Sequence, residues 1–178
     1  MGEGAAKKIR IAALMALCLS APLLTGATGR LTSLDSRVLA AHNRERTDAG
    51  LPQLRWDPAL AADAAEWGEE LAAIDDIEHA PDDPDDPEPQ GENLWLGSRG
   101  HFAPEQMVGM WIEEKKHYVA RPIPYSSRTG KFDDVGHYTQ LMWRDTGKIG
   151  CALANGRAHE ILVCRYSTAG NVEGERPF

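Results

Sequence analysis

Apolar residues in the first half of the chain recur at the spacing expected for amphipathic helices. The clearest stripe, with members at i, i+4, i+7 and i+11, consists of Leu60, Ala64, Trp67 and Leu71. It predicts a core-facing helix from Pro58 to about Ala73. Asp57 is the expected N-cap, and Pro58 occupies the first helical position, where proline is favoured.

An earlier helix is predicted over Leu34 to Asp48, because Ser33 can serve as its N-cap and Gly50 follows its end. The residues that share its apolar face are Leu34, Val38 and Ala41. Arg44 and Glu45 lie away from that face, so we expect both side chains to be available to solvent.

A third helix is predicted from Pro104 to about Tyr118, and it carries the most informative exception to the pattern. Its apolar stripe at i, i+4 and i+11 consists of Met107, Trp111 and Tyr118. Glu114 occupies the i+7 position of that stripe, whereas Glu113 lies off it. A carboxylate on a core-facing side is costly unless it is paired or hydrogen-bonded, so Glu114 is a candidate site residue. A structural hydrogen-bond network would explain its position equally well.

Shorter apolar runs near the end of the chain predict strands over residues 148–153 and 160–166. The Asn155–Gly156 pair between them is a strong hairpin signal, so we expect the two strands to pair. Pairing would bring Cys151 and Cys164 together across the ladder, which predicts a disulfide; two buried free thiols are the alternative. Helices followed by late strands indicate an α+β or layered α-β-α fold rather than repeated βαβ units.

The N-terminus has the residue order of a secretory signal peptide. Basic residues at positions 7, 8 and 10 precede an apolar run from Ile11 to Leu24, and small and polar residues follow. The run is short for a membrane span, which needs about 20 apolar residues. We predict a signal peptide over 1–27, with an uncleaved signal anchor as the alternative, and a tail and helix start over 28–38. Export would also favour oxidation of the two remaining cysteines.

The chain is acidic, with a formal net charge of -8 and a sequence pI of about 5.2. This balance argues against nucleic acid as a partner and against a purely electrostatic attraction to anionic lipid. After the predicted signal peptide no apolar stretch is long enough to span a membrane, and we expect a monomer. Residues 80–90 interleave prolines with carboxylates, which favours a solvated acidic loop over a calcium site, because the EF-hand spacing is absent.

Three further residues join Glu114 as candidates for a polar site. His79 ends the second helical region, Glu92 follows a glycine before an apolar pair, and His137 opens the most aromatic stretch of the chain. The spacing of these residues matches no specific metal-binding motif. From the residues alone, a shared site and separate structural roles are both open.

Five segments carry recognisable motifs: Ala-His-Asn-Arg-Glu-Arg at 41–46, Gly-Glu-Asn-Leu at 91–94, Trp-Ile-Glu-Glu with a later tyrosine at 111–118, Gly-His-Tyr-Thr-Gln-Leu-Met-Trp at 136–143, and Ile-Leu-Val-Cys-Arg-Tyr at 161–166 with the residues that follow it. In this order they resemble the motifs of the CAP superfamily of cysteine-rich secretory proteins, antigen 5 and pathogenesis-related 1 proteins. The resemblance covers residues 39–178, which we assign as the CAP (SCP) domain. Two positions depart from it: Thr168 stands where the family has proline, and Phe178 where it has tyrosine.

The resemblance implies an α+β fold, a three-layer α-β-α sandwich around a central, mainly antiparallel sheet. It also implies that His79, Glu92, Glu114 and His137 converge in a central cleft. The additional cysteines of the venom and sperm members are absent, together with their cysteine-rich extension. Their absence argues against the ion-channel activity associated with that extension.

The function favoured by this resemblance is a secreted binding module for an apolar ligand, a sterol or lipid, or for an extracellular partner. The alternative is a zinc-dependent, protease-like hydrolase. In it His79 and His137 would bind Zn²⁺ or another divalent cation, and Glu92 and Glu114 would orient them or act as general base. Catalysis ranks below binding because two histidines are fewer than the three ligands usual in catalytic zinc sites. No Ser or Cys nucleophile with a partner base is evident either, and a purely structural polar network is the third interpretation.

Overall fold

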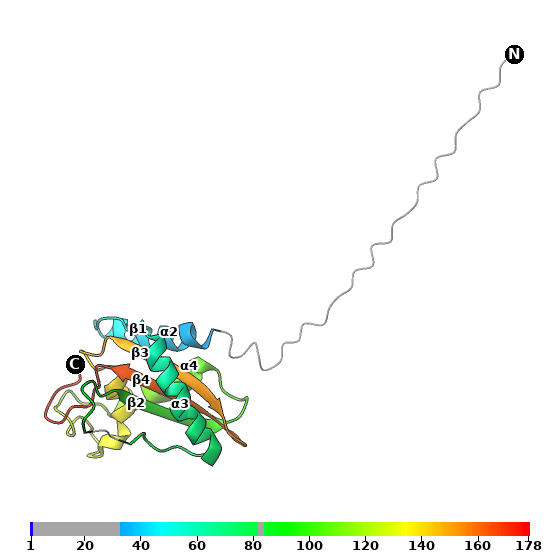
Figure 1. Ribbon diagram of the computed structural model, residues 1–178. Coiled ribbons are helices and arrows are strands. Elements are labelled where there is room, and N and C mark those ends of the chain that lie inside the picture. Colours follow the sequence, from blue (N-terminus) through cyan, green and yellow to red (C-terminus); the bar gives the residue numbers. More distant parts are fainter. Residues whose placement is uncertain (2–32, 82–83) are drawn as a thin grey trace.

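The computed structural model describes Met1 and residues 33–81 and 84–178 (Figure 1). The predicted signal peptide, apart from Met1, and residues 28–32 lie outside the described residues. Within the described part of the chain, no helix is both long enough and apolar enough to cross a membrane.

The described chain forms helices and strands in a mixed order. In sequence they are α2 (Leu34–Asp48), β1 (Arg55–Trp56), α3 (Pro58–Ile74), β2 (Gly91–Ser98), α4 (Pro104–Glu113), η1 (Glu114–His117), η2 (Phe132–Asp134), α5 (Gly136–Leu141), β3 (Lys148–Asn155) and β4 (His159–Ser167). The strands form one sheet in the order β1-β3-β4-β2. The β3–β4 and β4–β2 pairs are antiparallel, and the short β1 pairs with β3 in parallel.

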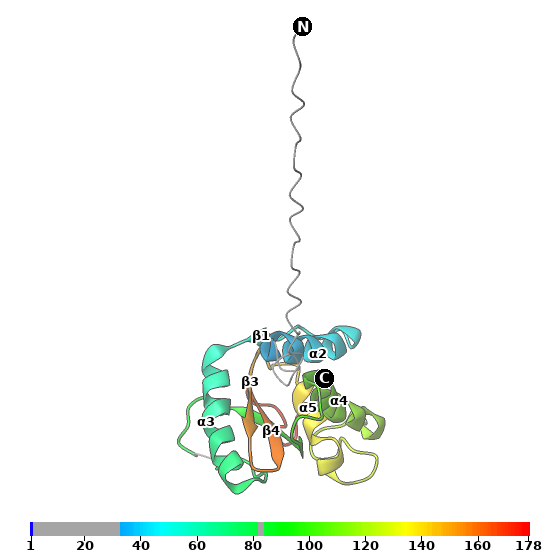
Figure 2. The same ribbon diagram turned by 90° about the vertical axis from the view of Figure 1, so that its right-hand side faces the viewer.

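The sheet is covered on both faces. Figure 2 shows α3 on one side of the sheet and α4 and α5 on the other. The core beneath α3 consists of Ala64, Leu71, Leu94, Ile161 and Val163. The larger core on the opposite face includes Val38, Met107, Trp111, Leu141, Leu162 and Cys164. Alternate residues of β4 therefore belong to different cores, as the twofold period of a strand requires. The α+β, three-layer α-β-α architecture is confirmed.

Helix α3 approaches the sheet most closely at Gly150 of β3. A Cβ atom on Gly150 would collide with the backbone nitrogen of Ala61 and lie 2.6 Å from the carbonyl oxygen of Asp57. Any larger residue at position 150 would push the start of α3 away from the sheet. The predicted cap of α3 is confirmed, because Asp57 Oδ1 accepts a hydrogen bond of 2.9 Å from the backbone N–H of Ala59.

Helix α2 has the predicted bounds and Ser33 is its N-cap residue, but the capping hydrogen bond expected of the Ser33 side chain is not formed. Ser33 has a left-handed backbone, with φ of 57°, and its side chain makes no capping bond. Instead the hydroxyl of Ser36 donates to the carbonyl oxygen of Ser33 at 3.0 Å. A serine in this conformation cannot aim its Oγ at the first N–H groups of the helix.

The expectation that Glu45 faces solvent is also wrong. Its side chain is only 12% exposed, because Glu45 Oε1 accepts hydrogen bonds from Lys115 Nζ at 2.7 Å and from the hydroxyl of Tyr138 at 3.2 Å. Both partners come from distant segments, so the helical pattern of α2 contains no sign of them. Burial and the Glu45 charge raise the pKa of the Tyr138 hydroxyl, which therefore stays protonated and can donate.

The third predicted helix changes character at the candidate site residue. It is α-helical only over Pro104–Glu113 and continues as a 3-10 helix over Glu114–His117.

The strand β2 was not predicted, because its consecutive residues Leu94 and Trp95 are both buried and hide the alternation typical of a strand.

The predicted hairpin and disulfide are confirmed. Cys151 of β3 stands directly opposite Cys164 of β4, with 4.1 Å between their Cα atoms and a Sγ–Sγ bond of 2.05 Å. The strands end slightly later than predicted, and Gly156 N–H donates to the carbonyl oxygen of His159 to close the turn. The bridge therefore fixes two central strands to each other.

Candidate functional site

Glu114 and His137 form the first of two histidine–carboxylate pairs. Glu114 Oε1 lies 2.6 Å from His137 Nδ1, and its Oε2 accepts the backbone N–H of Tyr138 at 3.0 Å. The 3-10 turn at the end of α4 brings Glu114 to the start of α5, where His137 is the second residue. An ionised carboxylate only accepts hydrogen bonds, so Nδ1 of His137 donates in this contact, and Nε2 would be an acceptor in a neutral ring.

The His137 ring is held in place by Trp111. The two rings stack, with centroids 6.0 Å apart and planes 12° from parallel. Trp111 is almost fully buried, and its Nε1–H donates to the carbonyl oxygen of Leu94 at 3.1 Å. The imidazole is therefore fixed both by its carboxylate and by a ring that is itself anchored to β2.

His79 and Glu92 form the second pair. His79 Nδ1 lies 2.6 Å from Glu92 Oε1, which also accepts the backbone N–H of Ala80 at 3.2 Å. The two side chains differ sharply in exposure, 67% for His79 and 8% for Glu92. Arg165, opposite Glu92 on β4, places Nη2 3.1 Å from Oε2, close enough for an ion pair although the contact lacks hydrogen-bond alignment.

The segment that carries His79 is tied to α3. Trp67 Nε1–H donates to the carbonyl oxygen of Glu78 at 3.1 Å. At the end of the acidic proline-rich loop, Gln90 Nε2 donates to Asp63 Oδ2 at 2.6 Å. Two residues of α3 thus hold the segment before the acidic proline-rich loop and the last residue of that loop.

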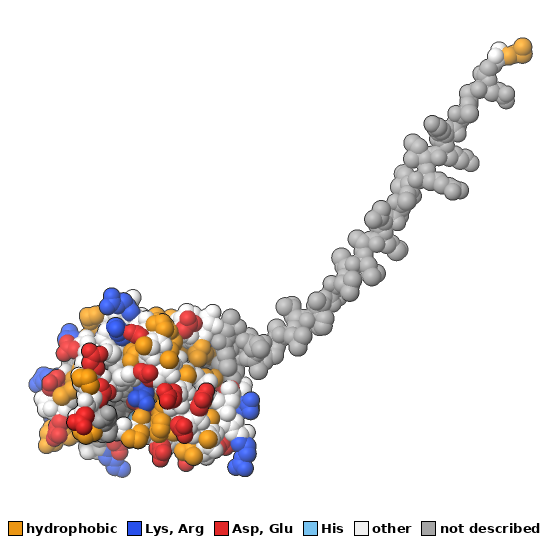
Figure 3. Space-filling view, viewed as in Figure 1, with side chains coloured by type: hydrophobic (Ala, Val, Ile, Leu, Met, Phe, Trp, Pro, Cys, Tyr) orange, Lys and Arg blue, Asp and Glu red, His pale blue; other side chains and the backbone are white. Residues whose placement is uncertain are grey.

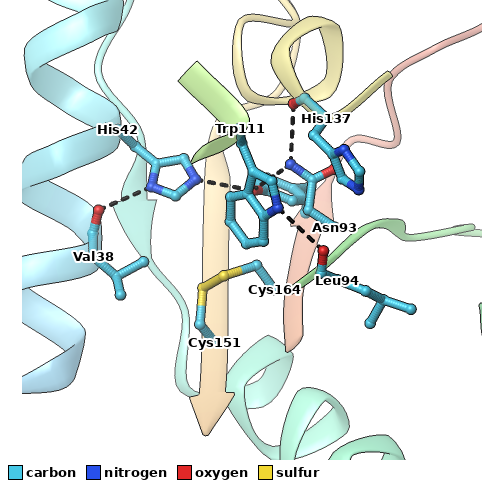
Figure 4. Close-up of a disulfide and its surroundings, with 9 residues drawn as sticks. Val38, His42, Asn93, Leu94, Trp111, His137, Cys151 and Cys164 are labelled. Carbon is cyan, nitrogen blue, oxygen red and sulfur yellow. Dashed lines mark hydrogen bonds between the residues drawn. A yellow bond between two sulfur atoms is a disulfide. The ribbon is translucent and has the colours of Figure 1, made fainter. Parts of the chain in front are cut away.

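Two neighbouring residues at the start of β2 contact the two histidines. Glu92 and Asn93 are neighbours on this strand, so their side chains point to opposite faces of the sheet. Glu92 reaches His79, while Asn93 Nδ2 donates to the carbonyl oxygen of His137 at 3.0 Å (Figure 4). One dipeptide of β2 therefore contacts both histidines.

The pairs line two different hollows, and the segment after α3 borders both. His79 and Glu92 line a hollow of about 730 Å³ together with Asp63, Glu66, Trp67, Glu70, Ala80, Pro81, Asp86, Pro89, Gln90 and Arg165. Glu114 and His137 line a hollow of about 440 Å³ together with Asp76, Ile77, Leu94, Trp95, Leu96, Met110 and Trp111. The first hollow is mostly polar and acidic, and the second is mostly apolar with a polar end.

The apolar hollow is open to solvent at two large side chains. Ile77 is 40% exposed and Met110 is 41% exposed. Met110 is oriented by Trp95, whose Nε1–H points at Met110 Sδ over 3.0 Å. An apolar surface that stays exposed beside a concave site is a common feature of ligand-binding sites.

A buried polar network behind the site was not predicted from the sequence. His42 Nδ1 donates to the carbonyl oxygen of Val38 at 2.9 Å, and its Nε2 accepts from the hydroxyl of Tyr166 at 2.9 Å (Figure 4). The Tyr166 oxygen in turn accepts from Asn93 Nδ2 at 3.2 Å. The network therefore connects α2, β4 and β2 to the backbone of His137. The available signal was the position of His42, four residues after the core residue Val38.

The network predicts a pH dependence of stability. Burial lowers the pKa of His42 to about 4, from an ordinary value near 6.5. Between pH 6.5 and 4 the unfolded chain binds a proton at His42 that the folded chain does not. The free energy of unfolding should therefore fall by about 3 kcal/mol as the pH falls through this window. Urea unfolding at a series of pH values measures this slope.

A substitution isolates the contribution of His42 to that slope. The His42→Gln variant keeps an amide that can hydrogen-bond but does not titrate, so stability should change less between pH 6.5 and 4. His101→Gln, which removes an exposed imidazole, is the matched control. If the free energy of unfolding changed equally with pH in His42→Gln and in the original chain, His42 would not be the source of the pH dependence.

The residues offer limited means of holding a metal ion. Each histidine of the two pairs uses Nδ1 toward a carboxylate, so a metal ion could be bound by these rings only through Nε2. Among residues 33–81 and 84–178, no three His, Cys, Asp or Glu side chains are grouped so that they could hold a metal ion. Within the two pairs, His79 and His137 carry the ring nitrogens, and each carboxylate contacts the Nδ1 of its own histidine.

Comparison with known proteins agrees with the motifs and the fold. The sequence profile described as the CAP, or cysteine-rich secretory protein, family matches residues 39–166, which is more than half of the chain. The chain belongs to this family. Pathogenesis-related protein 1A of Nicotiana tabacum is 34% identical over 142 residues, which cover 79% of this chain and 78% of that protein. Pathogenesis-related protein 1 of Arabidopsis thaliana is 33% identical over 141 residues, 79% of this chain and 80% of the relative.

Solved structures of similar proteins show the same fold. The crystal structure of NaASP2 with Zn²⁺ matches with a TM-score of 0.67 at 22% identity, covering 80% of this chain and 83% of that one. The structure of BmVAL-1 matches with a TM-score of 0.66 at 22% identity, covering 82% and 81%. At this level of identity the two matches support the CAP architecture and not a shared ligand.

Proposed function

We propose that this CAP protein is secreted and binds an amphipathic, mainly apolar ligand of the sterol or lipid class in the hollow beside His137. The signal-peptide pattern and the secretory family support export. The observation that carries the ligand class is the hollow itself, whose lining is mostly apolar and includes the Glu114–His137 pair. A molecule with an aliphatic or ring body and one polar group matches this lining.

The surface on the α3 side of the protein is ordinary for a protein in water. Figure 3 shows acidic, basic and apolar side chains interspersed over the face in view. Single exposed apolar residues are normal on such surfaces, so Ile77 and Met110 are informative because they line one hollow rather than because they are exposed. The alternative ligand of the hollow is an extracellular protein partner that inserts an apolar side chain into it.

Charged substitutions at the mouth of the hollow test this function. Ile77→Asp and Met110→Glu are each expected to weaken binding of a fluorescent sterol or long-chain alcohol by about ten- to a hundredfold. Each change removes the burial of one large apolar side chain, worth about 1.5–3 kcal/mol. Fluorescence titration measures the change.

Ile74→Asp is the matched control, because Ile74 is exposed at the end of α3 but does not line the hollow. Unchanged binding in the Ile77→Asp and Met110→Glu variants, or equal losses in all three, would place the ligand elsewhere on the protein.

Metal-assisted hydrolysis is the second candidate function. It is favoured by the two Nδ1–carboxylate contacts, which resemble the way carboxylates orient zinc-binding histidines. A zinc ion supplies Lewis acidity and lowers the pKa of a bound water. His79 and His137 would hold it, and Glu92 and Glu114 would keep both rings in the metal-binding tautomer.

A calorimetric zinc titration tests this second function. Two protein ligands predict weak binding, which should disappear in a His79→Ala/His137→Ala double variant that remains folded. His101→Ala controls for surface histidines. If neither the original chain nor the double variant binds zinc, the metal-dependent function is excluded and the apolar ligand is left as the function to pursue.

A further inference from the structure

We infer that the ligand of the apolar hollow is a cationic amphiphile, an aliphatic molecule that ends in a protonated amine. We expect the hollow to prefer it over an alcohol or a carboxylic acid of the same length. This inference rests on the proposed function, since it names the chemical class of the ligand for the same hollow. It depends on which charges and hydrogen-bonding groups face the hollow and which are already used within the protein.

The charged side chains that line the hollow are acidic. Among the described residues that line the hollow, Asp76 and Glu114 supply two carboxylates, and none is a lysine or arginine. The adjacent Lys115 does not offset them, because its Nζ is bonded to Glu45 Oε1 at 2.7 Å. A protonated amine would be attracted to these carboxylates, whereas a fatty-acid carboxylate would bring a third negative charge into the hollow.

The side-chain donors around the hollow are already occupied. Trp95 Nε1–H points at Met110 Sδ, and Trp111 Nε1–H donates to the carbonyl oxygen of Leu94. His137 donates through Nδ1 to Glu114, and in the neutral form of the ring Nε2 is then an acceptor. A ligand carboxylate would therefore meet acceptors, while an ammonium or a hydroxyl could donate to them.

Aromatic rings add to the same preference. Trp95 and Trp111 both line the hollow, and one face of the Trp111 ring is covered by His137. Any indole face that borders the hollow would attract a cation more strongly than a neutral group. The aliphatic body of the ligand would lie against Ile77, Leu96 and Met110, which carry no charge. An alkyl chain with a terminal ammonium thus meets apolar walls along its length and negative charge at its end.

A series of ligands of matched length tests the inference. Decylamine, decanol and decanoic acid are titrated at pH 7 below their micellar concentrations, with tryptophan fluorescence as the signal. The amine is expected to bind at least about tenfold more tightly than the acid, with the alcohol between them. The difference between amine and acid should shrink as salt rises from 0.05 to 0.5 M, because salt screens charges near the surface.

A charge-neutralising variant identifies the groups responsible. Asp76→Asn should reduce the amine-to-acid affinity ratio about threefold and leave decanol binding unchanged, because only the charge is removed. Glu113→Gln is the matched control, since Glu113 is exposed next to Glu114 but does not line the hollow. An Asp76→Asn variant with the original ratio would exclude Asp76 as a determinant of selectivity and overturn that part of the inference.

The outcomes separate this inference from the proposed function. Binding of decanoic acid as tightly as decylamine would overturn the inference, while the apolar-ligand function would stand. If none of the three ligands bound, the proposed function would fail and the inference with it. If all three ligands still bound to the Ile77→Asp variant, they would be adsorbed outside the hollow. That result would overturn both the inference and the proposed function.

Discussion

Replacing Arg46 with alanine should lower the free energy of unfolding by about 3–5 kcal/mol. The Arg46 side chain is fully buried, and its guanidinium donates to four backbone carbonyl oxygens at 2.8–3.0 Å. Those oxygens belong to Pro52, Leu141, Trp143 and Thr146. Each buried acceptor left without a donor costs about 1–3 kcal/mol, and water that enters the vacated space recovers part of it.

The contacts of Arg46 explain the size of this expected effect. Burial lowers the pKa of Arg46 to about 10, so the group is still protonated at neutral pH. Its charge is balanced by carbonyl dipoles, including that of Leu141 at the end of α5, rather than by a carboxylate. Arg46 thus joins α2 to the segment between α5 and β3, and this junction supports the helix that carries His137.

Urea unfolding of the Arg46→Ala and Arg46→Lys variants measures the effect. Lysine should recover only part of the loss, because one ammonium nitrogen with three donors cannot reach four separated carbonyls. Arg44→Ala is the matched control from the exposed side of the same helix, and it should change stability by no more than about 0.5 kcal/mol. A loss below about 1 kcal/mol for Arg46→Ala would mean that the carbonyls find other partners.

Removing the disulfide should have the second largest effect. A Cys151→Ala/Cys164→Ala double variant is expected to lose about 3 kcal/mol, within the range of 2–5 kcal/mol typical of native disulfides in secreted domains. The bridge closes a loop with a sequence separation of 13, so its loss mainly increases the entropy of the unfolded chain. The double variant is preferred to a single one, because a single substitution would leave a buried thiol.

Thermal unfolding of the double variant, and of the original chain with and without reductant, checks this expectation. Both cysteines are buried, at 4% and 0% exposure, so the reductant must act on the unfolded chain. Identical unfolding of the original chain under both conditions would contradict a stabilising role. Residues 165 and 166 follow Cys164 on β4 and contact Glu92 and Asn93, so ligand binding in the double variant also reports on the site.

Local signals in the sequence were sufficient where one element determines its own structure. The helix over Leu34–Asp48 and the start of α3 follow from apolar periodicity and from the Asp57–Pro58 pair, which act within a few residues. The Cys151–Cys164 bridge follows from a hairpin, because a turn between adjacent strands sets which residues face each other. Glu114 was identified as a site candidate because a carboxylate interrupted an apolar stripe.

Long-range packing decided the rest. Glu45 and His42 are partnered by residues far along the chain, and no helical pattern can contain those partners. The pairing of each histidine with its own carboxylate depends on where β2 lies, and the sequence pattern predicted neither β2 nor the short β1. Nor could the pattern show that the four candidate residues divide between an acidic hollow and an apolar one.

The physical reason is the range of the interactions. Periodicity, capping and hairpin turns act between near neighbours and can therefore be read from the sequence by itself. The polar partners of a buried side chain depend on which elements pack together. Packing of the apolar cores on the two faces of the sheet determines which elements are neighbours. The sequence by itself thus determined α2, α3, the α-helical part of α4, the hairpin, the family motifs and the candidate residues. Only the tertiary structure decided their partners and the chemistry of each hollow.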